Sequence, residues 1–392
     1  MKEYNLDVPA SCPFHVRRLN ESIYVFREHD NYGQFPNIYA KICSISGTNG
    51  SPTSVIVLSD AGCATSIKNP EYDLDTSKDP EIKTPKYWNI YTVLKHTINP
   101  TGQIPYLVIT THCHFDHILG IGLLPPIDSD PQHLPIDQRK GPRTTVLSSA
   151  HSTNHINPWN RICCHSLAKK FKADDCPYYS IGIWATDYQD VIYSPPATPP
   201  DFTITKTGPK IPTGITIIHT PGHTPDSLTW YDRDSHLICV GDSFYETSST
   251  DTQECEVEKS ERVPILFEER SHLRTWWESL NKVLVFVKAE NTRLASQHTA
   301  STPAPCVAIA ASHVTTTSPD AVAFLVSVRE FMVRILRSEV PATPLDRDRL
   351  PFKDVMAYDD GVEAGCSKDF EWIVWAPKRI IEEGIKELVG EY

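Results

Sequence analysis

The sequence predicts an α/β protein in which strands and helices alternate in layers. Apolar, strand-like runs lie on both sides of a segment with helical spacing, between about residues 64 and 104. In addition, successive strand-like runs end near a residue of a metal-binding type: 54–58 is followed by Asp60, and 106–109 by His112. Strands joined by a helix form βαβ units, and these favour a layered α/β fold.

The elements follow in order along the chain. Tyr87, Ile90, Tyr91, Leu94 and Ile98 recur at helical spacing and predict a helix that stops at the Asn-Pro-Thr-Gly sequence directly after them. Short apolar or alternating runs bounded by turn residues are typical of strands. They predict strands at 23–26, 38–42, 54–58, 106–109, 145–147, 215–218, 227–231, 236–240 and 306–311.

Two later helices complete the pattern. Apolar residues on one side predict a helix over 268–288. Ser-Pro-Asp at 318–320 predicts the start of a second helix, with proline at its first position, that runs to about Arg337. Residues 124–145 are rich in Pro and Asp and predict an exposed loop. The aromatic segment 155–200 has no clean periodicity, and either borders a pocket or forms a surface loop.

Charge and composition exclude several classes of function. Lys and Arg number 37 against 49 Asp and Glu, so the net charge is −12 and no basic block offsets it. Nucleic acids and anionic membranes require basic surface, and neither is an expected partner. No membrane span or secretory signal is recognisable, so we expect a soluble, cytoplasmic protein. The eleven cysteines include no C-x-x-C pair and indicate reduced, mostly buried thiols.

Residues 111–117, Thr-His-Cys-His-Phe-Asp-His, hold three imidazoles and a carboxylate directly after an apolar strand. Because the segment turns back over the strand end, side chains two and five positions apart can converge. Zinc prefers imidazole and carboxylate ligands, whereas calcium requires more oxygens. A polar loop with chance histidines is the alternative, but this density of ligand-type residues favours a metal site. The candidate ligands are His112, His114, Asp116 and His117, and we expect Cys113 to point away from them.

Later strands also end near residues of ligand type. His223 follows the strand at 215–218 in a Thr-Pro-Gly-His turn, and Asp242 follows the strand at 236–240. Two histidines compete for the last position, and we favour His313 over His298 because it follows an apolar strand and precedes a helix. Gly222 lets the chain turn sharply before His223. We expect Asp60 and His219 to support ligands rather than to bind metal.

This ordered set of residues resembles the metallo-β-lactamase superfamily of hydrolases, over about residues 20–340. The resemblance implies an αββα four-layer sandwich in a single decorated domain over 1–392, with its core at about 20–340 and a C-terminal extension at about 341–392. It also implies two zinc ions, with manganese or iron as alternatives. By resemblance, His112, His114 and His223 hold the first ion, Asp116, His117 and His313 hold the second, and Asp242 bridges them. The family usually has Gly-His where this chain has Ser312-His313.

The resemblance also suggests the chemistry. Two neighbouring cations can lower the pKa of water, so a metal-bound hydroxide would be the nucleophile. Tyr245, three residues after the bridging carboxylate, is similar to a lactonase tyrosine that stabilises the oxyanion, although packing is an alternative role. Residues 312–315, 338–341 and 376–377 resemble fungal members, some of which open lactams. We therefore expect hydrolysis of a small cyclic amide or ester, with Asp116 assisting proton transfer.

Other functions stay open at this stage. A glyoxalase II-type thioesterase uses nearly the same ligands, but it usually carries more basic residues for its carrier. A metal-binding scaffold without catalysis would also need these ligands. The expected protein is a monomer or a homodimer.

Overall fold

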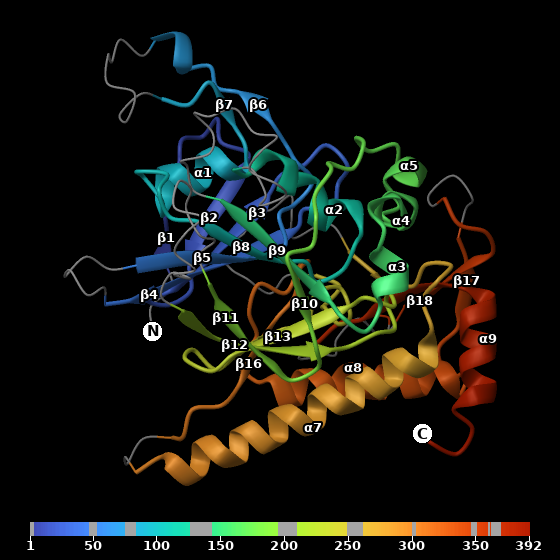
Figure 1. Cartoon of the computed structure of the whole chain (residues 1–392). Helices are drawn as coiled ribbons and strands as arrows, with labels where there is room; N and C mark the ends of the chain where they lie inside the picture. The colour runs from blue at the N-terminus through green and yellow to red at the C-terminus, as the bar shows by residue number, and fades with distance from the viewer. Residues whose placement is uncertain are drawn as a thin grey trace. The chain divides into compact units, whose positions relative to one another are not determined.

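The computed structural model describes residues 4–46, 53–74, 84–125, 143–194, 210–248, 262–299, 303–345, 351–359, 361 and 370–392 (Figure 1). The predicted loop at 124–145 lies largely outside them. The chain divides into two compact units. Unit 1 contains Met1–Ala185 and Gln189–Ile215, and unit 2 contains Thr186–Tyr188 and Thr216–Tyr392. The single-domain organisation stays a prediction.

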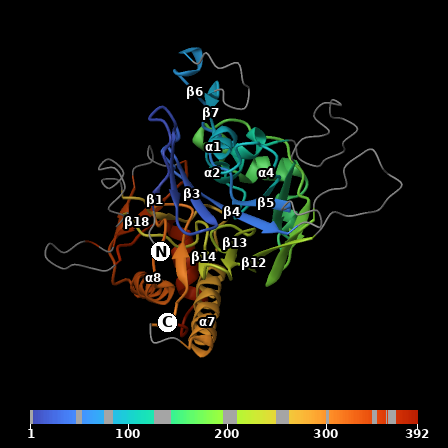
Figure 2. The same cartoon turned by 90° about the vertical axis from the view of Figure 1, so that its left-hand side faces the viewer.

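Unit 1 is built on a mixed sheet whose strands have the spatial order β1-β2-β3-β4-β5-β8-β9-β10. Neighbours from β1 to β5 are antiparallel, and β5, β8, β9 and β10 are parallel. The strands are β1 (Tyr4–Asn5), β2 (Phe14–Arg18), β3 (Ile23–Glu28), β4 (Asn37–Ile45), β5 (Thr53–Ser59), β8 (Tyr106–Ile109), β9 (Thr144–Ser149) and β10 (Ile183–Ala185). Figure 2 shows β3, β4 and β5 side by side.

The central strands of this sheet are almost wholly apolar, as expected for parallel strands that are buried on both faces. All four residues of β8 are buried, and β8 lies between β5 and β9. The register aligns Ser59 with Ile109 and Ile109 with Leu147. The carboxyl ends of β5, β8 and β9 therefore meet at one edge, which brings Asp60 beside the segment that follows β8.

Helix α1 (Ile90–Thr97) packs on this sheet through Ile90, Val93 and Leu94. The prediction that the helix already includes Tyr87 was wrong. Tyr87 and Trp88 form the short strand β7, paired with β6 (Ile67–Lys68), and Asn89 then caps the helix. The remaining elements of unit 1 are η1 (Tyr72–Leu74), α2 (Phe115–Ile118), η2 (Leu119–Leu123), α3 (Thr153–Ile156), α4 (Trp159–His165), α5 (Ala168–Phe171) and β11 (Gln189–Tyr193). Helices α3 to α5 are too short to produce a periodic signal, so the aromatic segment looked irregular in the sequence.

Unit 2 contains two sheets and three helices among its described residues. β12 (Ile211–His219) crosses the boundary between the units and enters unit 2 at Thr216. The strand order continues with β13 (Leu228–Asp232), β14 (Leu237–Cys239) and β16 (Ala308–Ala310). A second sheet has the order β15-β19-β18-β17. Its strands are β15 (Ile265–Leu266), β17 (Ala342–Pro344), β18 (Val355–Asp359) and β19 (Ile373–Pro377), and the helices are α7 (Leu273–Gln297), α8 (Ala321–Leu336) and α9 (Lys378–Glu387).

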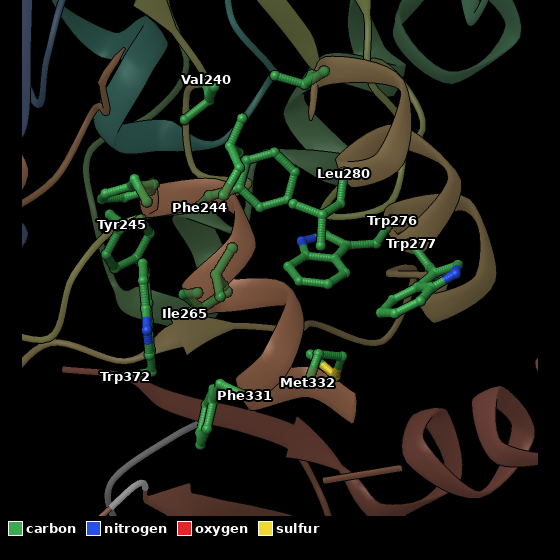
Figure 3. Close-up of a cluster of buried hydrophobic side chains, with 14 of the residues drawn as sticks. Val240, Phe244, Tyr245, Ile265, Trp276, Trp277, Leu280, Phe331, Met332 and Trp372 are labelled. Atoms are coloured by element: carbon green, nitrogen blue, oxygen red, sulfur yellow. The ribbon is translucent and has the colours of Figure 1, made fainter. Parts of the chain in front are cut away.

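Aromatic and aliphatic side chains form the core of unit 2 (Figure 3). Trp276 and Leu280 of α7 belong to this core together with Phe244 and with Met332 of α8. The prediction of proline at the first position of α8 was wrong, because Asp320 caps the helix by accepting hydrogen bonds from the N–H groups of residues 322 and 323. Helix α7 starts and ends later than the expected 268–288.

Each unit thus combines β-sheet and helices around its own core, and this confirms the predicted α/β class. Among the described residues, no helix has both the length and the apolar character that crossing a membrane demands.

Candidate metal centre

The first group of candidate ligands lies where β8 ends in unit 1. Main-chain hydrogen bonds continue past the strand, from Asp60 N to Ile109 O at 2.9 Å and from Thr110 N to Leu147 O at 3.0 Å. The chain then turns into helix α2, which begins at Phe115 with His114 as its N-cap residue. The short helix places Asp116 and His117 in its first turn. A strand end followed at once by a helix therefore places all four candidate ligands within six consecutive residues.

Asp60 organises this segment. Its carboxylate accepts hydrogen bonds from Thr111 N at 2.7 Å, from Thr111 Oγ1 at 2.8 Å and from His117 Nδ1 at 3.0 Å. The Thr111 hydroxyl oxygen lies 3.1 Å from His112 Nδ1 and can accept its hydrogen. Both imidazoles are then fixed as the Nδ1–H tautomer, and this leaves the lone pair on Nε2 for a metal. The role expected for Asp60 as a supporting residue agrees with these contacts.

The candidate ligand atoms of unit 1 have spacings suited to shared coordination. His112 Nε2 lies 2.9 Å from His114 Nδ1, and His117 Nε2 lies 3.3 Å from Asp116 Oδ2. Two ligands at about 2.1 Å from one tetrahedral zinc are about 3.4 Å apart. The pairs His112–His114 and Asp116–His117 therefore fit one ion each. Cys113 is buried, and its Sγ lies within 4.8 Å of a ring nitrogen of His155, a residue that the sequence analysis did not single out.

In unit 2, parallel pairing brings two candidate ligands together. Strands β14 and β16 align Cys239 with Ala310, and the ligand-type residue follows three positions later in each chain segment. The main chain holds this alignment past the strand ends, because Ser312 N donates to Gly241 O at 3.0 Å. Asp242 and His313 are therefore neighbours, with Asp242 Oδ2 3.3 Å from His313 Nε2.

His223 reaches the same carboxylate from a tight turn. Its Nε2 lies 3.8 Å from Asp242 Oδ2, and its Nδ1 lies 2.9 Å from Leu266 O, to which it can only donate. The turn requires Gly222, whose φ is +139° and whose added Cβ would lie 2.3 Å from the main chain of Trp276. Both His223 and His313 therefore lie within 4 Å of the Asp242 carboxylate.

The structure gives the remaining candidates different surroundings. Tyr245 is buried, its hydroxyl donates to Pro264 O at 2.5 Å, and its ring centroid lies 5.5 Å from that of His313. His298 ends helix α7 as its C-cap residue and is half-buried. His219 ends β12 and uses its main chain, since its N–H donates to Asp187 and its carbonyl accepts from Lys282.

Two buried carboxyl groups were missed by the sequence analysis. Burial raises the pKa of Glu28 in unit 1 to about 7, although hydrogen bonds from Thr65 and Cys63 lower it. Burial likewise raises the pKa of Glu246 in unit 2 to about 7, against a hydrogen bond from Thr315. Glutamate at the end of an apolar strand, as in Ile23–Glu28, was the available signal for the first.

The donor set can be tested against possible metals. Each unit contributes buried imidazole and carboxylate groups, and no thiolate is among the proposed ligands. Such a mixture suits zinc and also accommodates manganese or iron, whereas calcium and magnesium prefer oxygen ligands. The residues present therefore fit divalent transition metals.

Comparison with known proteins gives one family match and one curated relative. Residues 105–298 match the sequence profile of the Metallo-beta-lactamase superfamily. A protein of Aspergillus versicolor named "Putative transcription factor avaE" is 25% identical over 248 residues, which cover 63% of this chain and 61% of that protein. The match thus spans less than two thirds of that relative's own length.

Two solved structures that match this chain have little sequence identity to it. A beta-lactamase domain protein from Burkholderia ambifaria is 13% identical with a TM-score of 0.46, and the alignment covers 85% of this chain and 76% of that chain. An archaeal metallo-beta-lactamase superfamily protein from Sulfolobus tokodaii is 10% identical with a TM-score of 0.43, covering 94% and 99% of the two chains.

Proposed function

Because residues 105–298 match the sequence profile of the Metallo-beta-lactamase superfamily, we propose that the protein is a metal-dependent hydrolase that opens a lactam or lactone ring. The two groups of ligand-type residues described above together hold two divalent ions in this proposal. His112, His114 and His223 would hold the first ion, Asp116, His117 and His313 would hold the second, and Asp242 would serve both.

One observation carries this proposal above the others. In each unit, buried ligand-type side chains follow strand ends. Main-chain pairing within that unit fixes the positions of these side chains. The carboxylate of Asp242 lies within 4 Å of His223 and His313, which are the two histidines that unit 2 would contribute to different ions.

The metal ions would lower the pKa of a water molecule and polarise the substrate carbonyl. The protein residues supply orientation and proton transfer. Asp60 holds the imidazole of His117 in one tautomer, and Leu266 O does the same for His223. Asp116 can accept a proton from the attacking water and pass it to the leaving nitrogen or oxygen, which is general acid–base catalysis. Zinc is the proposed metal, with manganese or iron as alternatives.

The choice of a cyclic amide or ester rests on sequence. It depends on the late segments that resemble lactam-opening fungal proteins. The position of Tyr245 relative to Asp242 is the weaker argument, because the Tyr245 hydroxyl donates to Pro264 O. The relative's name describes a transcription factor, but the net charge of −12 disfavours nucleic acid as a partner of this chain.

Metal analysis combined with a substrate panel tests the proposal. The purified protein is assayed for zinc, manganese and iron, and for hydrolysis of lactones, lactams, thioesters and phosphodiesters. We expect two metal equivalents and activity on a lactone or lactam that His114→Ala and Asp242→Ala each reduce at least about 1000-fold, because both remove groups that hold the ions.

The panel also separates the alternatives. Turnover of thioesters alone would favour the glyoxalase II-type thioesterase hypothesis. Metal binding without turnover of any substrate would favour a non-catalytic metal-binding scaffold. A matched control is Asp232→Asn, which alters a buried aspartate in β13 that accepts hydrogen bonds from Asp234 N and Ser235 Oγ in the adjacent turn. Unchanged rates in the His114 and Asp242 variants would refute the proposed hydrolase mechanism.

A further inference from the structure

Glu28 is a buried acid in unit 1 that the proposed reaction does not use. It ends strand β3, and its side chain is only 1% exposed. Burial of a carboxylate costs free energy unless hydrogen bonds compensate for the lost water. Two main-chain donors do so here: Cys63 N donates to Oε2 and Thr65 N donates to Oε1, both at 2.7 Å.

The segment that Glu28 holds, residues 60–65, has an unusual backbone. Asp60, Gly62 and Ala64 have φ values of +65°, +79° and +63°. The left-handed region is unfavourable for residues other than glycine and persists only where the surroundings impose it. At Gly62 an added Cβ would lie 1.9 Å from Glu28 Oε2, so the carboxylate lies directly against this backbone.

The same segment contacts the metal-binding residues at several points. Asp60 accepts hydrogen bonds from Thr111 and His117. Ala61 N donates to His117 O at 2.8 Å, and Gly120 N donates to Gly62 O at 3.0 Å. Residues 60–62 therefore contact both the start of the ligand segment and the end of helix α2.

We propose that Glu28 is a positioning residue for the metal centre, which acts by holding the main chain of residues 60–65 and, through Asp60 and Ala61, sets the orientation of His117. The link to metal binding rests on the proposed function, whereas the link to the geometry of residues 60–65 does not. The path runs from β3 through one loop to the first turn of α2, and all of it lies within unit 1.

The surroundings of Glu28 support this role. Desolvation is the largest influence on its pKa, and the hydrogen bonds from Thr65 and Cys63 act against it. Asp30 is the charged neighbour that raises the pKa further. A carboxyl group in such a place is held by its hydrogen bonds to residues 63 and 65, and it holds them in return.

Glu28→Gln is the first test, because glutamine keeps the volume but can accept only one of the two N–H groups. Its NH₂ group then faces the other main-chain donor. The control is Asn99→Ala, which removes a fully buried side chain bonded to Ile104 and Tyr106 at the opposite end of β8. Both variants lose buried hydrogen bonds, but only the first lies on the proposed path.

Amide hydrogen exchange in the metal-free full-length protein is the primary readout. We expect Glu28→Gln to accelerate exchange at residues 60–65 and 111–120 by roughly tenfold or more, while Asn99→Ala leaves these segments unchanged. The proposal would be overturned if residues 111–120 of Glu28→Gln exchanged as slowly as in the wild type. Equal acceleration of exchange in both variants would overturn it as well.

Zinc titration against a competing chelator is the second readout. In Glu28→Gln one of the two ions should bind about tenfold more weakly, which is typical of lost support for a ligand, while the other ion binds as in the wild type. Equal weakening of both ions would mean a general loss of structure and contradict the positioning role. A wild type that binds no zinc would refute the proposed function, and the exchange result would still decide the role of Glu28.

Discussion

At the residue scale, hydrogen bonds decide which atoms of the candidate ligands are available to a metal. Asp60 and Thr111 occupy the Nδ1 side of His117 and His112, and Leu266 O occupies that of His223. All three rings are thus fixed in the orientation that offers Nε2. Supporting partners of this kind fix ligand geometry before the metal binds, which reduces the conformational entropy lost on binding.

Tyr245 provides a prediction in which the sequence and the structure favour different roles. Since its hydroxyl already donates to Pro264 O, it has no hydrogen left to stabilise an oxyanion in this conformation. Tyr245→Phe should therefore lower the free energy of unfolding by about 1 kcal/mol and leave kcat nearly unchanged. Steady-state kinetics and urea denaturation measure the two effects. A fall in kcat of about 100-fold or more would instead support the oxyanion role.

Glu28 predicts a pH dependence of stability. Its pKa is about 7 in the folded protein against 4.5 for an ordinary glutamate side chain, so the folded state favours the protonated form. This stabilisation is fully present below about pH 4.5 and is lost as the pH rises through 7. From pH 4.5 to 8 the wild type should lose up to about 3 kcal/mol of unfolding free energy relative to Glu28→Gln.

Urea denaturation of both proteins in a chelator, at a series of pH values, measures this difference. The groups that face the carboxyl are Cys63, Thr65 and Asp30, and the thiol pKa of Cys63 is raised well above its usual value by burial. A difference between the two proteins that does not change with pH would show that Glu28 does not titrate in this range.

At the scale of elements, strand pairing carries the ligand-type residues to common positions. The register of β5 with β8 places Asp60 beside Thr111, and that of β14 with β16 places Asp242 beside His313. Parallel neighbours end at the same edge of a sheet, so residues distant in sequence meet there. A shift of one residue in either register would separate these pairs.

The turn before His223 depends on its contact with helix α7. His272 N donates to Gly222 O at 2.8 Å, and Ser271 Oγ donates to His223 O at 2.6 Å. Gly222→Ala would place a Cβ against the main chain of Trp276, and either the turn or the helix must move. We expect a loss of about 3 kcal/mol or more in unfolding free energy together with weaker metal binding.

Gly33→Ala is the matched control for this substitution. Gly33 also has a positive φ, +72°, but nothing lies within 4 Å of an added Cβ. Only the backbone cost of about 1 kcal/mol should then appear, with metal binding unchanged. Equal losses of stability in the two variants, measured by urea denaturation, would show that the contact with Trp276 is unimportant.

At the scale of the whole molecule, metal binding should stabilise the fold. Any ion that binds the folded protein but not the unfolded chain stabilises the fold, by about 2.7 kcal/mol at a concentration of 100 Kd. Zinc should therefore raise Tm in a thermal denaturation scan, and a chelator should reverse the increase. Asp242→Ala should abolish most of the increase.

The same scan decides between the two late histidines. We expect His313→Ala to reduce the zinc-dependent increase in Tm, because His313 lies beside Asp242. His298→Ala should retain the increase, since His298 caps the end of α7. The opposite pattern would assign the last ligand to His298.

Much of the candidate site could be predicted from the order of residues because its signals are local. Four ligand-type residues within 111–117 and a Pro-Gly turn before His223 are visible without any structure, as are the apolar runs that end near them. These patterns predicted the α/β class and carried the resemblance to the metallo-β-lactamase superfamily. The residues at which helices begin were less predictable. The start of α1 depends on the pairing of β6 with β7, and the start of α8 depends on the Asp320 cap.

Only the tertiary structure could assign roles that depend on contacts between distant residues. Glu28 meets residues 63 and 65 across more than thirty positions, and Tyr245 meets Pro264 across nineteen. No local pattern encodes such partners, since a glutamate in a strand and a tyrosine after a turn look the same whether they face water or main chain. Burial and hydrogen-bond geometry arise from packing of the whole unit, and they determine which of these groups is available for chemistry.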